Sequence, residues 1–187
     1  FIFDPRQIGK QPYHSSSAVQ FMLTSLEELA GAIKRHGGRL YFFFGKAEEV
    51  VRQLLRKERC QAIFINADYT PFSQARDTAL QEAAQAAGAG FFCRHDLLLA
   101  DPDKLRTKRG GHYTVFTPFF RAASQATVPE PHAEIPERFF SGPTQIEPIR
   151  DIARLKPPAN PLIFRGGGRA EALRIISGLR RFKGYDR

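Results

Sequence analysis

The chain of 187 residues contains no tryptophan, one methionine and only two cysteines. Cys60 and Cys93 lie in strand-like apolar runs, without the spacing of a metal-binding motif or the number that a disulfide framework needs. We expect both to be small, buried apolar side chains in a reducing compartment, which indicates a cytoplasmic protein. No apolar run approaches the roughly 20 residues of a membrane-spanning helix, so the sequence predicts no membrane partner.

Acidic residues are scarce relative to basic ones, because 19 Asp and Glu stand against 28 Lys and Arg, for a net charge of +9. Such an excess favours polyanionic partners, nucleic acid first, since neutralised phosphates release counterions. The five histidines are scattered without the spacing of metal ligands. The sequence therefore predicts no metal site.

Short apolar runs alternate with helical patterns in the first half of the chain. The runs are 1–3, 40–44, 62–65 and 90–93, and helices are expected at 16–35, 47–58 and 71–87. Unalternating apolar runs indicate strands buried on both faces, as in a parallel sheet covered by helices. The sequence therefore predicts an α/β fold with a doubly wound, mostly parallel, Rossmann-like sheet. Because the first run begins at Phe1, we expect the chain to be part of a longer protein.

The character of the chain changes after residue 121. Eight prolines lie between residues 122 and 165, which indicates a long linker that runs over a surface. Helical spacing resumes at 169–182, after the glycines 166–168. These glycines follow no convincing strand, so we interpret them as a turn into a helix rather than a phosphate-binding loop.

Four aromatic residues crowd the segment 113–120: Tyr113, Phe116, Phe119 and Phe120. Pro118 disfavours a long helix or a central strand there, so we expect these rings on irregular backbone. Each ring can bury about 150–250 Å². The segment is therefore expected either to fill the core or to serve as the docking surface of a second domain.

Polar residues follow the predicted strands, where ligands of parallel sheets usually bind. They are Asp4, Gly45, Asn66 with Asp68, and His95 with Asp96. We expect them to line one edge of the sheet, either as ligand-binding groups or as helix caps and turn formers. His95 and Asp96 have no nucleophile on a sharp turn to complete a catalytic site, which disfavours hydrolase chemistry.

Taken in order, five motifs resemble the photolyase/cryptochrome family: FIFDP, NADYTPFSQARD, HDLLLADPDKLRT, HYTVFTPFFRA and GGGRAEAL followed by LRRF and GYDR. The resemblance implies three parts. Residues 1–121 correspond to the α/β antenna-chromophore domain without its first strand, 122–165 to the interdomain linker, and 166–187 to the start of the helical domain that binds FAD. The absence of tryptophan fits a chain without most of that helical domain.

The resemblance implies a fragment of a deoxyribodipyrimidine photolyase, which uses light and a flavin to repair pyrimidine dimers in DNA. Tyr185 matches a tyrosine that packs at the FAD, and Asp4 and Asp68 match residues near a deazaflavin antenna chromophore. Phe72 and Ser73 stand where folate-binding relatives carry an Asn-Glu pair, which disfavours a folate antenna.

The resemblance also implies which partners to expect. Damaged DNA would bind through the helical domain, and the full-length protein would be a monomer. The full-length protein is expected to be an enzyme, whereas the fragment alone is expected to be inactive, so whether this chain counts as an enzyme stays open. The alternatives are a cryptochrome-like blue-light photoreceptor and a free-standing α/β module for a nucleotide-like ligand.

Overall fold

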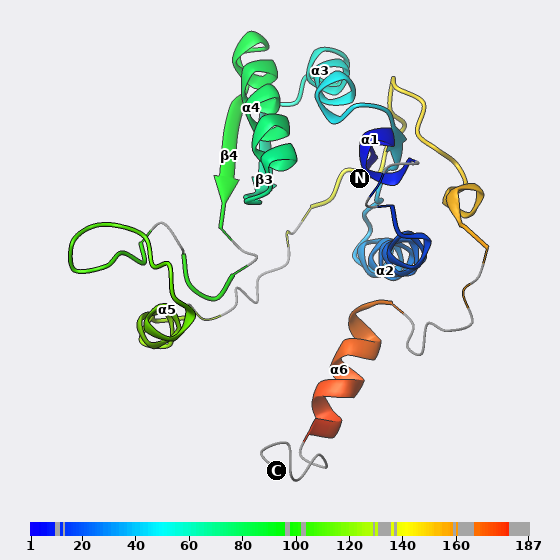
Figure 1. Ribbon diagram of the computed structural model, residues 1–187. Coiled ribbons are helices and arrows are strands. Elements are labelled where there is room, and N and C mark those ends of the chain that lie inside the picture. The colour runs from blue at the N-terminus through cyan, green and yellow to red at the C-terminus, as the bar shows by residue number, and fades with distance from the viewer. Residues whose placement is uncertain are drawn as a thin grey trace. The chain divides into compact units, whose positions relative to one another are not determined.

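The computed structural model describes residues 1–9, 12, 14–95, 98–101, 104–128, 130, 136, 138–158, 160 and 167–179. The chain divides into two compact units, Phe1–Glu58 with Pro136–Arg187, and Arg59–Ile135. In the described residues, each unit contains one pair of parallel strands and helices that connect them (Figure 1).

The first unit pairs β1 (Ile2–Phe3) with β2 (Phe43–Phe44), so that Ile2 lies opposite Phe43. Its helices are α1 (Pro5–Ile8), α2 (Ser16–Arg35), α3 (Ala47–Glu58), the 3₁₀ helix η1 (Ile152–Leu155) and α6 (Arg169–Gly178). Helix α2 begins where the Ser15 hydroxyl accepts a hydrogen bond of 3.2 Å from the Ala18 amide. Serine is one of the residues preferred at this N-cap position.

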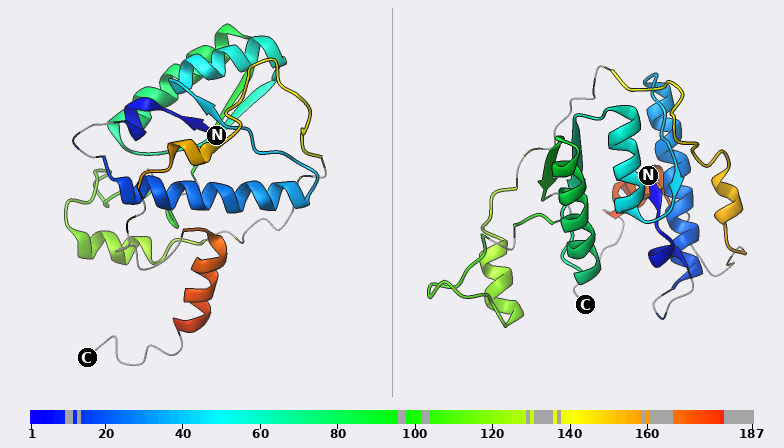
Figure 2. Two further views of the ribbon diagram at one scale, coloured as in Figure 1. Left: turned by 90° about the vertical axis from the view of Figure 1, so that its right-hand side faces the viewer. Right: turned by 90° about the horizontal axis from the view of Figure 1, so that it is seen from above.

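The core of the first unit joins the start of the chain to its proline-rich part. Phe3, Leu23, Leu26 and Ile152 are buried together. The Ile149 amide donates a 2.7 Å hydrogen bond to the Phe42 carbonyl, and η1 lies beside α2 (Figure 2). Part of the predicted linker therefore packs over β1 and α2, although the domain boundaries themselves stay a prediction.

The second unit pairs β3 (Ala62–Asn66) with β4 (Gly90–Arg94) in parallel, from Ala62 opposite Gly90 to Asn66 opposite Arg94. Helix α4 (Pro71–Ala86) connects the two strands. Its N-cap is Thr70, whose hydroxyl accepts a 3.2 Å hydrogen bond from the Ser73 amide, and proline occupies the first helical position, where its missing N–H costs nothing. Leu80, Ala83 and Ala84 are the buried apolar side chains of α4.

The α/β fold class is confirmed, but two expectations about burial are wrong. Phe64 is 71% exposed and stacks on Phe92, its partner in the strand register, at a ring distance of 4.7 Å. Cys60 and Cys93 are exposed as well. The unalternating sequence pattern predicts burial of both faces of each strand, whereas these side chains lie on surfaces that the described structure leaves uncovered.

The aromatic segment differs from its predicted irregular backbone, because α5 (Phe116–Ala123) is helical. Pro118 lies in the first turn of α5, where no intrahelical partner for its amide is needed. Phe116 and Phe120 stack at 5.8 Å and are 74% and 56% exposed. A core-filling role is therefore wrong for these two rings, and the docking surface stays a prediction.

The described residues contain neither a candidate membrane span nor a candidate metal site. None of the helices there combines the length and the hydropathy needed to cross a bilayer. The same part of the chain has no group of three or more His, Cys, Asp or Glu side chains arranged to hold a metal ion.

Candidate functional site

A pocket of about 250 Å³ lies in the first unit, between β1 with α1 and the first turns of α2. Only Asp4 separates β1 from α1, and Ser15 is the N-cap of α2, so the starts of both helices line the same pocket as the carboxyl end of β1. The lining residues are Phe1, Ile2, Phe3, Asp4, Gln7, Ile8, Ser15, Ala18, Val19 and Met22. This edge of a parallel strand pair is where α/β proteins usually bind ligands.

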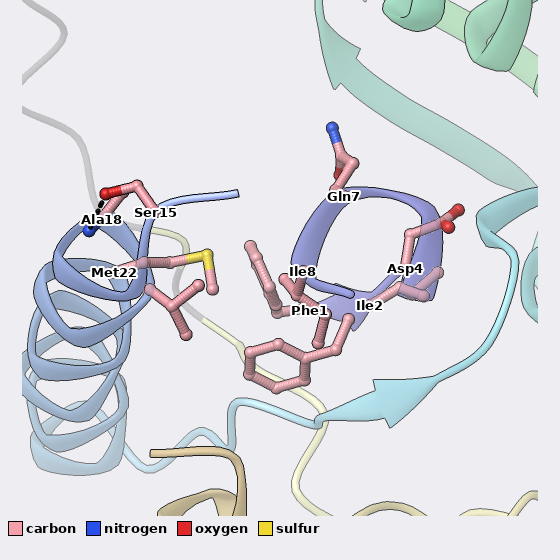
Figure 3. Close-up of a pocket in the computed structure, with 10 residues that line it drawn as sticks. Phe1, Ile2, Asp4, Gln7, Ile8, Ser15, Ala18 and Met22 are labelled. Atoms are coloured by element: carbon pink, nitrogen blue, oxygen red, sulfur yellow. Dashed lines mark hydrogen bonds between the residues drawn. The ribbon is translucent and has the colours of Figure 1, made fainter. Parts of the chain in front are cut away.

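The wall of the pocket is mainly apolar. Figure 3 shows Met22 on α2 directed across the pocket toward Ile8 and Phe1. The Phe1 and Phe3 rings meet edge to face at 5.0 Å, an arrangement that aromatic pairs prefer. Drug-sized ligands occupy pockets of roughly 300–1,000 Å³. At about 250 Å³ the pocket lies below that range, so its apolar wall could cover only part of such a ligand.

Asp4 is the buried polar residue of this pocket, with 2% of its surface exposed. Its Oδ1 accepts hydrogen bonds of 2.9 Å from the Arg6 amide and from Arg6 Nε. Its Oδ2 accepts bonds of 2.6 Å from Arg6 Nη2 and 3.1 Å from the Ala47 amide. The one carboxylate therefore caps α1 and also binds the N-terminal residue of α3, which lies 43 positions along the chain.

Arg6 extends this network to α3. Its Nη1 and Nη2 donate hydrogen bonds of 3.0 and 2.7 Å to the two carboxylate oxygens of Glu48. Burial raises the pKa of both Asp4 and Glu48, but the hydrogen bonds and the charge of Arg6 outweigh it, so both pKa values lie below their usual range. Both carboxylates are therefore ionised at neutral pH, and they hold Arg6 in a fork that suits paired oxygens.

Asp68 belongs to the second unit, after β3. Its Oδ2 accepts a 2.8 Å hydrogen bond from the hydroxyl of the buried Ser73, and its Oδ1 accepts one of 3.3 Å from the Thr70 amide. The Ser73 hydrogen bond, followed by that of Thr70, lowers the pKa of Asp68. Asp68 therefore orders the loop that leads into α4.

His95 contacts an aromatic residue in the same unit. Its Nδ1 lies 2.8 Å from the Tyr69 hydroxyl, and the two rings stack at 6.0 Å. Tyr69 precedes α4 and His95 follows β4, so the pair joins two strand-end loops. Asp96 lies outside the described residues.

The sequence-predicted site residues have three different outcomes. Asp4 lines the pocket of the first unit, whereas Asp68 belongs to the second unit, so a shared antenna site stays a prediction. Tyr185, the predicted FAD contact, lies outside the described residues. Sequence reasoning missed Ser15, Ala18 and Met22 as pocket residues. The serine N-cap that follows the first strand was the available signal.

Comparison with known proteins identifies relatives of this chain in both sequence and fold. A family model described as DNA photolyase matches residues 1–137. A deoxyribodipyrimidine photo-lyase of Agrobacterium fabrum is 36% identical over 109 residues, which are 58% of this chain and 22% of that protein. The crystal structure of an archaeal photolyase from Sulfolobus tokodaii, determined with two FAD molecules and interpreted as implying a novel light-harvesting cofactor, matches 94% of this chain and 38% of its own. Its TM-score is 0.79 and its sequence identity 34%.

A cryptochrome from Synechocystis sp. PCC6803 shares the fold, with a TM-score of 0.73 and 19% identity over 98% of this chain and 39% of that one. The α/β fold of this chain is thus shared with photolyases and cryptochromes. The chain belongs to the DNA photolyase family. It spans less than two fifths of the length of each of these three proteins.

Proposed function

We propose that this chain is the α/β part of a deoxyribodipyrimidine photolyase, which repairs pyrimidine dimers in DNA under light. The observation that carries the proposal is the match of the photolyase family model to residues 1–137, the part that contains the strand-end pocket. Bound FAD would supply the photo-excited electron that splits the dimer. The fragment would be inactive alone, because FAD binds mostly in the helical domain, which residues 166–187 would begin and which Tyr185 would help to build.

The role of this chain in that reaction is to hold a second, light-harvesting chromophore in the pocket of the first unit. The apolar wall of Phe1, Ile8 and Met22 would contact part of the ring system of a deazaflavin or flavin. The hydrogen bonds that the Asp4 carboxylate accepts come from Arg6 and from the Ala47 amide. Asp4 would therefore fix the shape of the pocket and leave contact with the ring to its apolar neighbours.

Repair activity is tested on the full-length gene product with ultraviolet-damaged duplex DNA, under blue light and in the dark. We expect repair only under light. A product that binds FAD and repairs nothing under blue light would contradict the photolyase proposal. That result would support the cryptochrome-like photoreceptor, which the fold match to the Synechocystis protein favours as the second candidate.

The antenna pocket has its own test. Ala18 lines the pocket and is exposed, so Ala18→Trp should fill the pocket without disturbing the core. Ala75 is an exposed alanine of α4, which lies in the other unit, and Ala75→Trp is the matched control. We expect the first variant to lose the absorbance of the second chromophore and the control to retain it. Retention by both variants would place the antenna elsewhere.

A further inference from the structure

We propose that the turn Thr107–Gly111 is a contact for the phosphate backbone of duplex DNA, through the side chains of Lys108 and Arg109. The surrounding segment, residues 104–129, contains five Lys or Arg and no Asp or Glu. Lys104 Nζ lies 3.6 Å from Asp101 Oδ2, whereas Lys108 and Arg109 are adjacent cations within the turn. Concentrated positive charge of this kind attracts polyanions.

The turn is closed by its own hydrogen bonds. The Gly110 amide donates to the Thr107 carbonyl at 2.8 Å, and the Thr107 amide donates to the Gly111 carbonyl at 2.9 Å. The Gly111 amide also donates to Thr107 Oγ1 at 3.1 Å. Gly110 has φ of 82°, which glycine adopts without strain. The closed turn presents Lys108 and Arg109 together at its exposed tip.

The charges at this tip are not neutralised within the described part of the chain, where Lys108 and Arg109 have no carboxylate partner. Other exposed cations do have one nearby, as in Lys46 with Glu49 at 3.2 Å and Arg174 with Glu171 at 2.7 Å. The guanidinium of Arg106 lies at the base of the turn, with Nη1 at 2.6 Å from His112 Nε2. A phosphate that approaches Lys108 and Arg109 therefore meets two cations without displacing a carboxylate of the described residues.

The chemistry favours the sugar-phosphate backbone over the bases. Lys and Arg are the usual phosphate ligands, and contacts with the backbone carry no sequence information. A short turn also lacks the helix or ribbon that reads a major groove. The turn would therefore contribute affinity to any duplex, damaged or intact. This proposal rests on the DNA-binding role proposed above, but it does not depend on light, flavin or repair.

The test measures how the affinity of the full-length gene product for an undamaged duplex depends on salt, in the dark. The logarithm of the binding constant falls by about 0.9 per phosphate contact for each tenfold rise in salt. The double variant Lys108→Gln, Arg109→Gln should therefore reduce the salt slope by about 1.8 and weaken binding at low salt. The matched control is Lys34→Gln, Arg35→Gln, which alters another exposed Lys-Arg pair at the end of α2.

We expect the control slope to equal that of the wild type. Equal slopes for the wild type and the turn variant would overturn the proposal, as would an equal loss in both double variants. A loss of binding to anionic lipid vesicles without a loss on duplex DNA would assign the turn to a membrane surface and would also overturn it. Repair under blue light is measured separately, so a failure of the photolyase proposal would leave this result interpretable.

Discussion

Replacing Asp4 tests the strongest structural claim about the pocket, namely that one carboxylate connects β1, α1 and α3. In Asp4→Ala the amides of Arg6 and Ala47 lose their acceptor, and Arg6 keeps its ion pair with Glu48. The pocket would also lose the group that fixes the entry of α1. We therefore expect a large destabilisation from a residue for which the sequence leaves open a ligand-binding role or a helix-capping role.

The magnitude follows from these contacts. Loss of an aspartate N-cap costs about 1 kcal/mol, and a buried amide left without an acceptor costs about 1–3 kcal/mol. The Arg6 side chain is 38% exposed, so solvent screens its ion pair, and that contribution adds at most about 1 kcal/mol. We expect Asp4→Ala to reduce the free energy of unfolding by about 2–4 kcal/mol.

The assay is urea unfolding of the chain followed by far-ultraviolet circular dichroism, because the chain has no tryptophan to report by fluorescence. The matched control is Asp151→Ala, since Asp151 is an exposed aspartate that caps η1 through a 2.9 Å bond from the Ala153 amide. We expect that control to lose about 0.5–1 kcal/mol. If Asp4→Ala cost no more than the control, the argument that Asp4 joins three elements would be wrong.

Two further predictions concern the first unit. The lowered pKa values of Asp4 and Glu48 mean that the folded chain binds fewer protons than the unfolded chain near their usual values of 3.8 and 4.5. The stability that these groups contribute should therefore be complete above those values and fall as the pH drops through the folded pKa values. Acid titration of the free energy of unfolding should show a steeper fall in the wild type than in Asp4→Asn. In Gly168→Ala the new Cβ would meet the Glu28 carboxylate at a backbone φ of 106°, and the Ala170 amide would lose its 2.9 Å hydrogen bond to Glu28. We expect the free energy of unfolding in urea to fall by about 1–3 kcal/mol. A smaller loss would contradict the claim that the Glu28 hydrogen bond holds the start of α6.

The sequence predicts the helices well because their signals are local. Apolar spacing predicts one helix at 16–35, and α2 spans Ser16–Arg35. The bounds of α3 agree in the same way. The expected second strand at 40–44 is shorter in the structure, as β2 contains Phe43–Phe44. Strand length depends on pairing with another segment, which no local pattern specifies.

The sequence predicts side-chain environments less well, because these depend on which surfaces meet. Phe64 lies in an apolar run yet is mostly exposed. Pro118 suggested irregular backbone, although a proline in a first helical turn is tolerated and α5 forms there. In both cases the expectation from the local sequence is wrong, because the burial of Phe64 and the backbone at Pro118 depend on the surrounding structure.

By itself, then, the amino-acid sequence determined the α/β class, the helix positions and the family resemblance, because periodicity, caps and motif order are properties of neighbouring residues. Only the tertiary structure decided what Asp4 does. Its carboxylate binds the Ala47 amide, and its partner Arg6 binds Glu48. Those partners lie more than 40 residues away, and they meet only because β1 and β2 pair in parallel and bring the start of α3 to the carboxyl end of β1.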